Sequence, residues 1–178
     1  MSATITSDDG YLALSPVFAE LGRAVFVCQC FEHSLVALHC LVSHEQQPPD
    51  GSAFQAAVER FSRLPLGTLL AELRKRVEVP SDVDEYLSTG IQMRNKVIHR
   101  FADEYVQRLF EPKGRLEVVQ ELAAIKQQLT ERDNLIHELI DPLLNRHGSS
   151  VASLVKNADD LWDYLNPGLP NTPAPTGH

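Results

Sequence analysis

The chain has 178 residues, of which 43% are hydrophobic and 22% are charged, and its formal net charge is -8. These values are typical of one globular domain with a buried core, and they exclude a disordered chain. The first residues are polar and acidic, without the basic and apolar regions of a signal peptide. We therefore expect a cytoplasmic protein.

The longest apolar stretch covers residues 17–42 and also carries Glu20, Arg23, Glu32 and His33. A membrane span of roughly 20 residues does not tolerate that many charges. We therefore expect no membrane association.

Cys28, Cys30 and Cys40 lie in the same stretch, at a spacing that matches no zinc signature. Their odd number argues for reduced thiols, which pack as small hydrophobic side chains in an intracellular protein. His33, His39 and His44 are six and five residues apart, which is not the spacing of metal ligands. We expect neither a metal site nor a cofactor.

A first helix is predicted to begin at Ser15-Pro16, after a flexible segment over residues 1–14. Ser15 would be the N-cap, and Pro16 would occupy the first turn, where its missing N–H costs nothing. Apolar residues then recur at three- and four-residue steps over about seven turns. They are Phe18, Leu21, Val25, Cys28, Phe31, Leu35, Leu38 and Val42.

Further helices are predicted near residues 53–63, over PLGTLLAELRKR, from Ser81 to about residue 108, and over 116–145 with a bend or end at Pro142. Pro112-Lys113-Gly114 is expected to form the turn before the last of them. Residues 148–165, with Trp162, are expected to form a short C-terminal helix, followed by a proline-rich tail over 166–178. The pattern predicts an all-α, up-and-down bundle of four to five helices over residues 15–147.

One arginine interrupts an apolar stripe of the helix predicted from Ser81. The stripe contains Leu87, Ile91, Arg94, Ile98, Phe101 and Tyr105. An unpaired charge among buried neighbours is costly, so Arg94 should meet an acid, a ligand or a polar cleft of a partner subunit. Gly90, one turn earlier, should leave open space that a bound group or a facing backbone could fill.

His99 lies about 140° around the helix from Arg94, so the two residues are not expected to share a face. Asn95, His99 and Asp103 do share one, and either neighbour of His99 could hydrogen-bond its imidazole. A phosphate held by Arg94 and His99 would lie over the groove between the two faces. Alternatively, a twofold axis could bring Arg94 of one subunit towards His99 of the other.

The spacing Arg-x4-His is not specific, because a chain of this composition gives roughly 0.4 matches by chance. A second match, Arg132 to His137, lies in the last long helix. We interpret this second pair as structural, although spacing alone does not choose between the two.

The segment Arg94-Asn95-Lys96-Val97-Ile98-His99 resembles the R-N-x-x-x-H signature of the HEPN superfamily, whose members are small all-helical domains of toxin–antitoxin, phage-defence and RNA-processing systems. LGTLLAEL (66–73) resembles the LG-x-L helix found upstream in such domains, and His99-Arg100-Phe101 resembles their H-R-[FY] continuation. The resemblance covers roughly residues 15–147.

The resemblance implies a homodimer with facing motifs and a metal-independent endoribonuclease that cuts RNA by attack of its own 2′-OH. Arg94 would stabilise the phosphate, His99 would transfer protons, and Asn95 would orient His99 or a phosphate oxygen. Lys96 and Arg100 would hold the RNA backbone. The antagonist in such pairs is often a minimal nucleotidyltransferase that acts as antitoxin.

Other functions remain open. Residues 51–116 hold 11 basic and nine acidic residues, whereas each flank carries a charge of -5. The acidic flanks favour a non-catalytic, HEPN-like dimer that acts as a binding or scaffolding module, and an unrelated helical regulator is a third hypothesis. Family members silenced by nucleotide transfer carry a tyrosine two residues after the histidine. Here that position is Phe101, and the nearest tyrosine is Tyr105.

Overall fold

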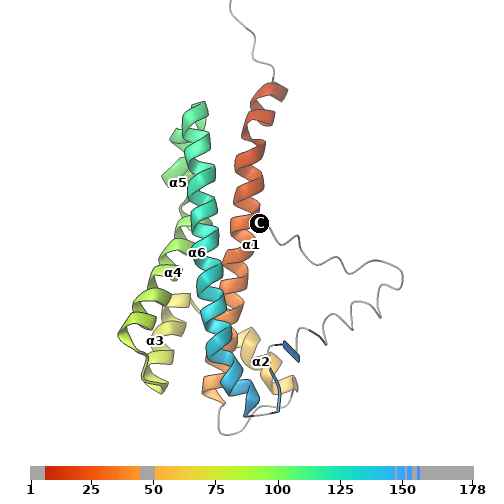
Figure 1. Ribbon diagram of the computed structural model, residues 1–178, viewed down its shortest axis with the longest axis vertical. Coiled ribbons are helices and arrows are strands. Elements are labelled where there is room, and N and C mark those ends of the chain that lie inside the picture. Colours follow the sequence, from red (N-terminus) through yellow and green to blue (C-terminus); the bar gives the residue numbers. More distant parts are fainter. Residues whose placement is uncertain (1–6, 45–50, 147, 151, 154–155, 157–178) are drawn as a thin grey trace, which may run out of the picture.

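The computed structural model describes residues 7–44, 51–146, 148–150, 152–153 and 156 (Figure 1). These residues form six α-helices and one 3-10 helix, and no strand occurs among them. The helices are α1 (Ser7–Ser43), α2 (Gly51–Phe61), α3 (Leu66–Arg76), α4 (Ser81–His99), α5 (Phe101–Tyr105), the 3-10 helix η1 (Val106–Phe110) and α6 (Pro112–Asn145). The predicted all-α class is confirmed. Most of the expected C-terminal helix and the whole tail lie outside the described residues.

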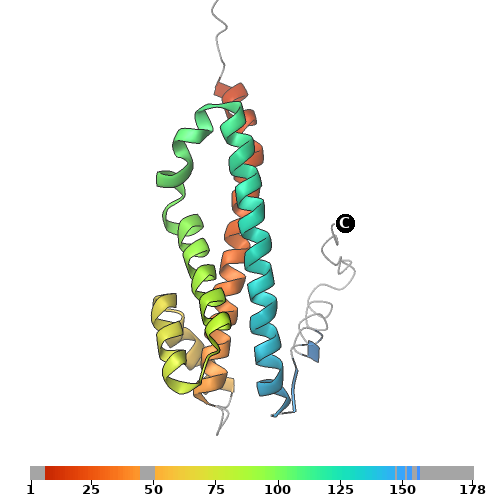
Figure 2. The same cartoon turned by 60° about the vertical axis from the view of Figure 1, so that its left-hand side comes forward.

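The three long helices, α1, α4 and α6, lie side by side (Figures 1 and 2). Helices α1 and α6 run in the same direction: Lys126 donates to Glu20 at 2.6 Å, and further along both helices His137 lies 3.1 Å from Ser34. Helix α4 runs the opposite way, and α2 and α3 lie at the end where α1 finishes and α4 begins. In chain order, α1 and α6 therefore run one way and α4 runs the other, and α2 and α3 are inserted between α1 and α4.

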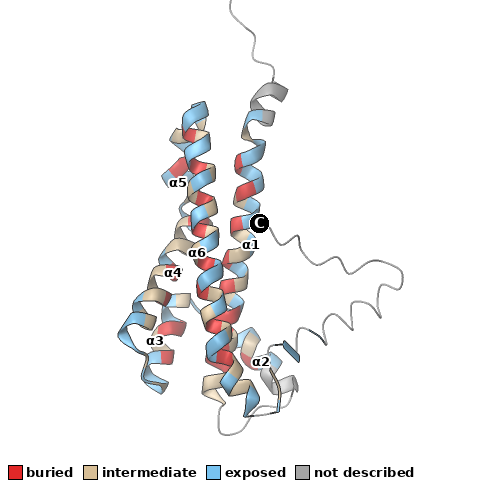
Figure 3. Cartoon of the chain, viewed as in Figure 1, coloured by how far each residue is buried: buried red, intermediate tan, exposed pale blue. Residues whose placement is uncertain are grey.

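The core lies mainly between α1 and α6, and buried residues follow both helices along most of their length (Figure 3). The predicted stripe of α1 buries Cys28, Phe31, Leu35 and Leu38, while Phe18 is 46% exposed. Burying a side chain of leucine or phenylalanine size contributes about 1.5–3 kcal/mol, so this seam dominates the stability of the fold.

Two predicted helix starts were wrong. Helix α1 begins at Ser7, so residues 7–14 are helical and Pro16 lies inside the helix. Pro16 is exposed, which lets water hydrate the carbonyl that its ring leaves without a partner. Helix α6 begins at Pro112, so the expected turn is its first turn. Gly114 is required there, because a Cβ would lie 2.0 Å from the carbonyl oxygen of Arg108.

The helix predicted from Ser81 to about residue 108 is divided into α4, α5 and η1, which raises the number of helices above the four to five expected. The break falls at Arg100, whose φ of -120° and ψ of 10° are not helical. Beyond it, Tyr105 is fully buried, and its hydroxyl donates to Glu121 of α6 at 2.9 Å. The break therefore leaves His99 as the last residue of α4.

Candidate functional site

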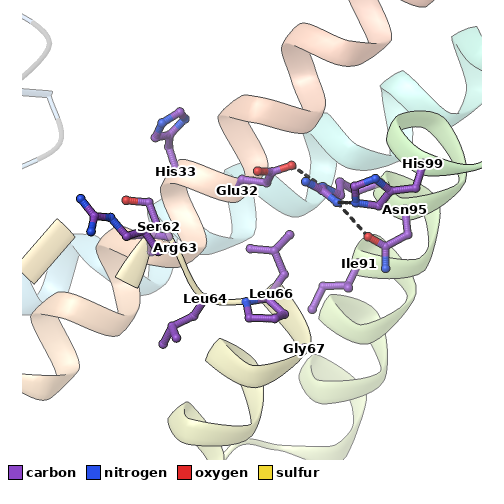
Figure 4. A pocket seen from close by; sticks show the side chains of 13 residues that line it. Glu32, His33, Ser62, Arg63, Leu64, Leu66, Gly67, Ile91, Asn95 and His99 are labelled. Atoms are coloured by element: carbon purple, nitrogen blue, oxygen red, sulfur yellow. Dashed lines mark hydrogen bonds and ion pairs between the residues drawn. The ribbon is translucent and has the colours of Figure 1, made fainter. Parts of the chain in front are cut away.

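Helix α4 presents the R-N-x-x-x-H residues to a pocket that encloses about 490 Å³. Ile91 and Val97 are buried and fix this part of α4 against the core. The pocket is lined by Glu32, His33 and Val36 of α1, by Ser62, Arg63, Leu64 and Pro65 between α2 and α3, by Leu66 and Gly67 of α3, and by Ile91, Arg94, Asn95 and His99 of α4. Figure 4 shows Glu32, Asn95 and His99 gathered at one end, with His33, Ser62 and Arg63 at the other.

Arg94 is the centre of the polar end. Its Nε donates to Oε1 of Glu32 in an ion pair between α4 and α1. Its Nη1 donates to Oδ1 of Asn95 at 3.0 Å and lies 2.6 Å from Nε2 of His99. The side chains of Arg94 and Glu32 are 16% and 27% exposed, so the pair lies in the wall of the pocket and not in the core. Arg94 thus meets an acid, which is one of the three kinds of partner expected from its position in the stripe.

Arg94 and His99 were not expected to share a helix face. Their side chains nevertheless meet. The long arginine side chain reaches along the helix and bridges the angular separation that the backbone imposes. A guanidinium only donates hydrogen bonds, so Nε2 of His99 accepts and the ring proton of a neutral imidazole is on Nδ1.

The expected partners of His99 are also different. No hydrogen bond joins His99 to Asn95 or Asp103 in the described part of the chain, because Asn95 accepts from Arg94 and Asp103 lies exposed in α5, beyond the break.

The space expected beside Gly90 is filled by side chains: a Cβ there would lie 2.7 Å from Cδ of Arg132 and 2.9 Å from Cζ of Phe31. Side chains, and not a facing backbone, therefore fill this space.

Lys96 and Arg100, the predicted RNA-binding residues, do not line the pocket. Lys96 donates to Oε1 of Glu121 at 2.5 Å, and Arg100 forms an exposed ion pair with Glu104 at 2.6 Å. The structure therefore brings Arg94, Asn95 and His99 together and places the two neighbouring cations elsewhere.

Glu121 joins α6 to the segment that follows the break. Lys96, Arg108 and Tyr105 all donate to it, at 2.5, 2.8 and 2.9 Å respectively. Burial raises the pKa of Glu121, but these hydrogen bonds and the charge of Lys96 outweigh burial and lower the pKa to about 2. The carboxylate thus stabilises the fold and holds Lys96 away from the pocket.

The second Arg-x4-His pair does not form a comparable site. Arg132 is 5% exposed and donates to the carbonyl oxygens of Tyr86 and Gln128, at 2.9 and 2.8 Å. Its guanidinium also lies 4.0 Å from the ring centroid of Tyr86. These contacts satisfy the buried charge within the bundle, which supports its structural interpretation.

The cysteines are free thiols; Cys28 and Cys40 are buried, and Cys30 is partly buried. Burial raises the pKa of Cys28 to about 12 and that of Cys40 to about 11. Burial and the charge of Asp133 also raise the pKa of Cys30. A raised pKa leaves little nucleophilic thiolate, so these residues serve as packing side chains.

Glu32 is the main residue of the site that sequence reasoning did not identify as functional. It lies 62 positions before Arg94 and beside the buried Phe31 in a core helix. A single acid in an amphipathic helix carries no signal of its own, and only the antiparallel packing of α1 and α4 brings it to the arginine.

Comparisons of the chain with protein-family models, curated proteins and solved structures find no match.

Within the described ranges, no group of three or more His, Cys, Asp or Glu side chains is placed to hold a metal ion. The segment Ala13–Ser43 of α1 is long and apolar enough to cross a membrane by length and composition alone. The core helix of a soluble protein meets the same criterion, so this segment does not decide where the protein acts.

Proposed function

We propose that this protein is a metal-independent endoribonuclease of HEPN type. The observation that carries the proposal is the meeting of Arg94, Asn95 and His99 in one open pocket, with the guanidinium 2.6 Å from the imidazole. Cleavage of RNA by its own 2′-OH needs proton transfer near neutral pH and a cation on the phosphorane oxygens. A histidine and an arginine supply these two functions without a metal.

In this proposal a backbone phosphate of RNA binds Arg94 in a bidentate manner, replacing its contacts with Glu32 and Asn95. Asn95 is then free to donate its amide to a phosphate oxygen, and His99 is placed for proton transfer. The products are a 2′,3′-cyclic phosphate and a 5′-hydroxyl. Lys96 and Arg100 would contact flanking phosphates once RNA competes with Glu121 and Glu104.

We also propose that the protein is a homodimer. Phe18 and Phe26, two turns apart on the helix that carries Glu32, are 46% and 65% exposed. A Cβ added to Gly22, midway between them, would meet no other atom within 4 Å, so this face is open to close approach. Large exposed aromatic side chains favour burial against a second copy.

The cellular role that fits this activity is a cytoplasmic toxin or defence effector. Its partner would be an antitoxin, for example one of the nucleotidyltransferase type. Nucleotide transfer onto Tyr105 is disfavoured, because that side chain is fully buried and donates to Glu121. We therefore expect such a partner to inhibit by covering the pocket.

One observation favours a second candidate function, a non-catalytic HEPN-like dimer that binds or scaffolds other molecules. Arg94, Lys96 and Arg100 are each neutralised by a glutamate in the free protein. Together with the net charge of -8, these pairs leave little free positive charge for RNA.

Cleavage of a pool of structured and single-stranded RNA in EDTA tests the proposal. The wild type should produce cyclic-phosphate ends, and Arg94→Ala and His99→Ala should lose them while remaining folded. His137→Ala is the matched control, because it removes the histidine of the second Arg-x4-His pair and should cut like the wild type. Intact RNA after incubation with the folded wild type would support the binding module instead.

A further inference from the structure

Attack by a 2′-OH requires two proton transfers on opposite sides of the phosphorus. The attacking 2′-oxygen loses a proton, and the departing 5′-oxygen gains one. Because attack is in line, the two groups that move these protons should flank the cation that holds the equatorial phosphate oxygens. His99 supplies one of them, and a second group should lie across the guanidinium.

Glu32 lies at that position. The carboxylate contacts Nε of Arg94, whereas His99 contacts Nη1, so the two residues approach different nitrogens of one guanidinium. They come from different helices, α1 and α4, as Figure 4 shows. Oε2 of Glu32 makes no hydrogen bond within the described residues, and the side chain is 27% exposed towards the pocket.

We propose that Glu32 is the general base and His99 the general acid of the proposed cleavage, an assignment that rests on the proposed function. The carboxylate takes the proton of the 2′-OH while the 2′-oxygen forms a bond to phosphorus. The bond from phosphorus to the 5′-oxygen breaks, and that oxygen receives a proton from Nε2 of the imidazolium. Solvent removes the proton from Glu32 and returns one to His99.

The free protein is consistent with this assignment of the acid. Nε2 of His99 accepts from Arg94 before RNA binds. A phosphate that takes over the guanidinium frees Nε2 to carry a proton taken from solvent and to donate it to the departing 5′-oxygen. Substrate binding thus prepares the acid, and it releases Glu32 from Arg94 to act as a base.

The environment of Glu32 bears on the pH dependence of the reaction. The groups around it are Arg94 and His99 of α4, Cys28 and His33 of α1, and Arg63 in the segment between α2 and α3. The thiol of Cys28 has its pKa raised to about 12 by burial and does not titrate near neutral pH. If Glu32 is the base, the acidic limb of the rate profile should disappear when Glu32 is replaced.

A purely structural role for Glu32 predicts the opposite result. If the carboxylate only neutralised Arg94, it would compete with phosphate for the guanidinium. Glu32→Gln would then strengthen RNA binding and leave the cleavage rate equal or higher. A general base predicts a lower kcat, with RNA binding retained or improved.

The test compares Glu32→Gln with His99→Ala and the wild type, measuring kcat against pH on an RNA that the wild type cuts. Glu72→Gln, which alters an exposed lysine–glutamate pair of α3 outside the pocket, is the matched control. We expect Glu32→Gln to lower kcat about 100-fold or more and to remove the acidic limb of the profile. Glu72→Gln should match the wild type. Circular dichroism and thermal melting verify folding.

A second substrate separates base from acid. Replacing the 5′-bridging oxygen by sulfur at the cut site creates a leaving group that needs no proton. His99→Ala should cut this substrate at close to the wild-type rate, whereas Glu32→Gln should remain slow. A Glu32→Gln variant with wild-type kcat, or a His99→Ala variant that sulfur does not rescue, would overturn the assignment but leave the nuclease intact. A wild type that cuts neither substrate would overturn both proposals.

Discussion

Nη1 of Arg94 lies 2.6 Å from Nε2 of His99, although five positions along α4 separate the two residues. The contact depends on the length of the arginine side chain and on the end of the helix at His99, which leaves the imidazole at the edge of the pocket. The same guanidinium also holds Glu32 and Asn95. One planar fork thus organises three side chains from two helices.

This geometry predicts that Arg94→Lys is not a conservative change. An ammonium is a point charge and cannot donate from the nitrogens of a fork to Glu32, Asn95 and His99 together. If the proposed nuclease is active, Arg94→Lys should lower kcat about 100-fold or more while the protein stays folded. Arg23→Lys is the control, because Arg23 is an exposed arginine of α1 outside the pocket and forms an ion pair with Glu20. Equal kcat values for both variants and the wild type would show that the fork is not used.

A second prediction concerns packing beneath the site. In Gly90→Ala the added Cβ would displace Arg132 or Phe31, which should cost about 1–3 kcal/mol. The better helix propensity of alanine offsets about 1 kcal/mol of this cost, so we expect a net destabilisation of up to about 2 kcal/mol. Gly22→Ala, at an open position of α1, should stabilise by up to about 1 kcal/mol. Urea unfolding of the two variants measures both changes, and a stabilising Gly90→Ala would contradict the packing argument.

Much of this architecture follows from the sequence alone. Apolar periodicity and helix breakers predict the all-α class and helix α3 over Leu66–Arg76. The resemblance of residues 94–99 to an R-N-x-x-x-H signature also singles out Arg94, Asn95 and His99, which the structure brings into one pocket. These features are local, because they depend on residues within a few turns of one another.

The features that were not predictable depend on distant contacts. The helix break at Arg100 contains no glycine or proline from which it could be predicted. It accompanies the burial of Tyr105 against Glu121. The meeting of Glu32 with Arg94 depends on how α1 packs against α4. A helical wheel gives directions of Cβ atoms but not the reach of a long side chain, which is why the contact between Arg94 and His99 was missed.

The Glu121 cluster predicts a particular loss of stability in acid. The pKa of Glu121 falls from an ordinary 4.5 to about 2 in the folded protein, so the folded state prefers the carboxylate. The resulting stabilisation is complete above pH 4.5 and is lost as the pH falls towards 2; it amounts to at most about 3 kcal/mol.

Glu121→Gln should therefore be less stable than the wild type at pH 7, and the difference should shrink between pH 4.5 and 2. Urea unfolding across this range gives the comparison. Glu117→Gln is the control, since Glu117 is 3.6 Å from Arg108 and more exposed, and we expect a smaller effect of pH on its difference from the wild type. A constant difference between Glu121→Gln and the wild type would show that the cluster contributes no pH-dependent stability.

The proposed homodimer gives a last prediction, located on α1. Phe26 is 65% exposed, and a carboxylate there would have to be desolvated if this face is buried between two copies. Phe26→Glu should therefore convert the dimer to a monomer with little change in the stability of the monomer. Phe26→Leu keeps an apolar side chain and should remain dimeric. Analytical ultracentrifugation over a range of concentrations measures the state of all three proteins. A wild type that is monomeric throughout would refute the dimer, and a Phe26→Glu variant that stays dimeric would place the interface on another face of the bundle.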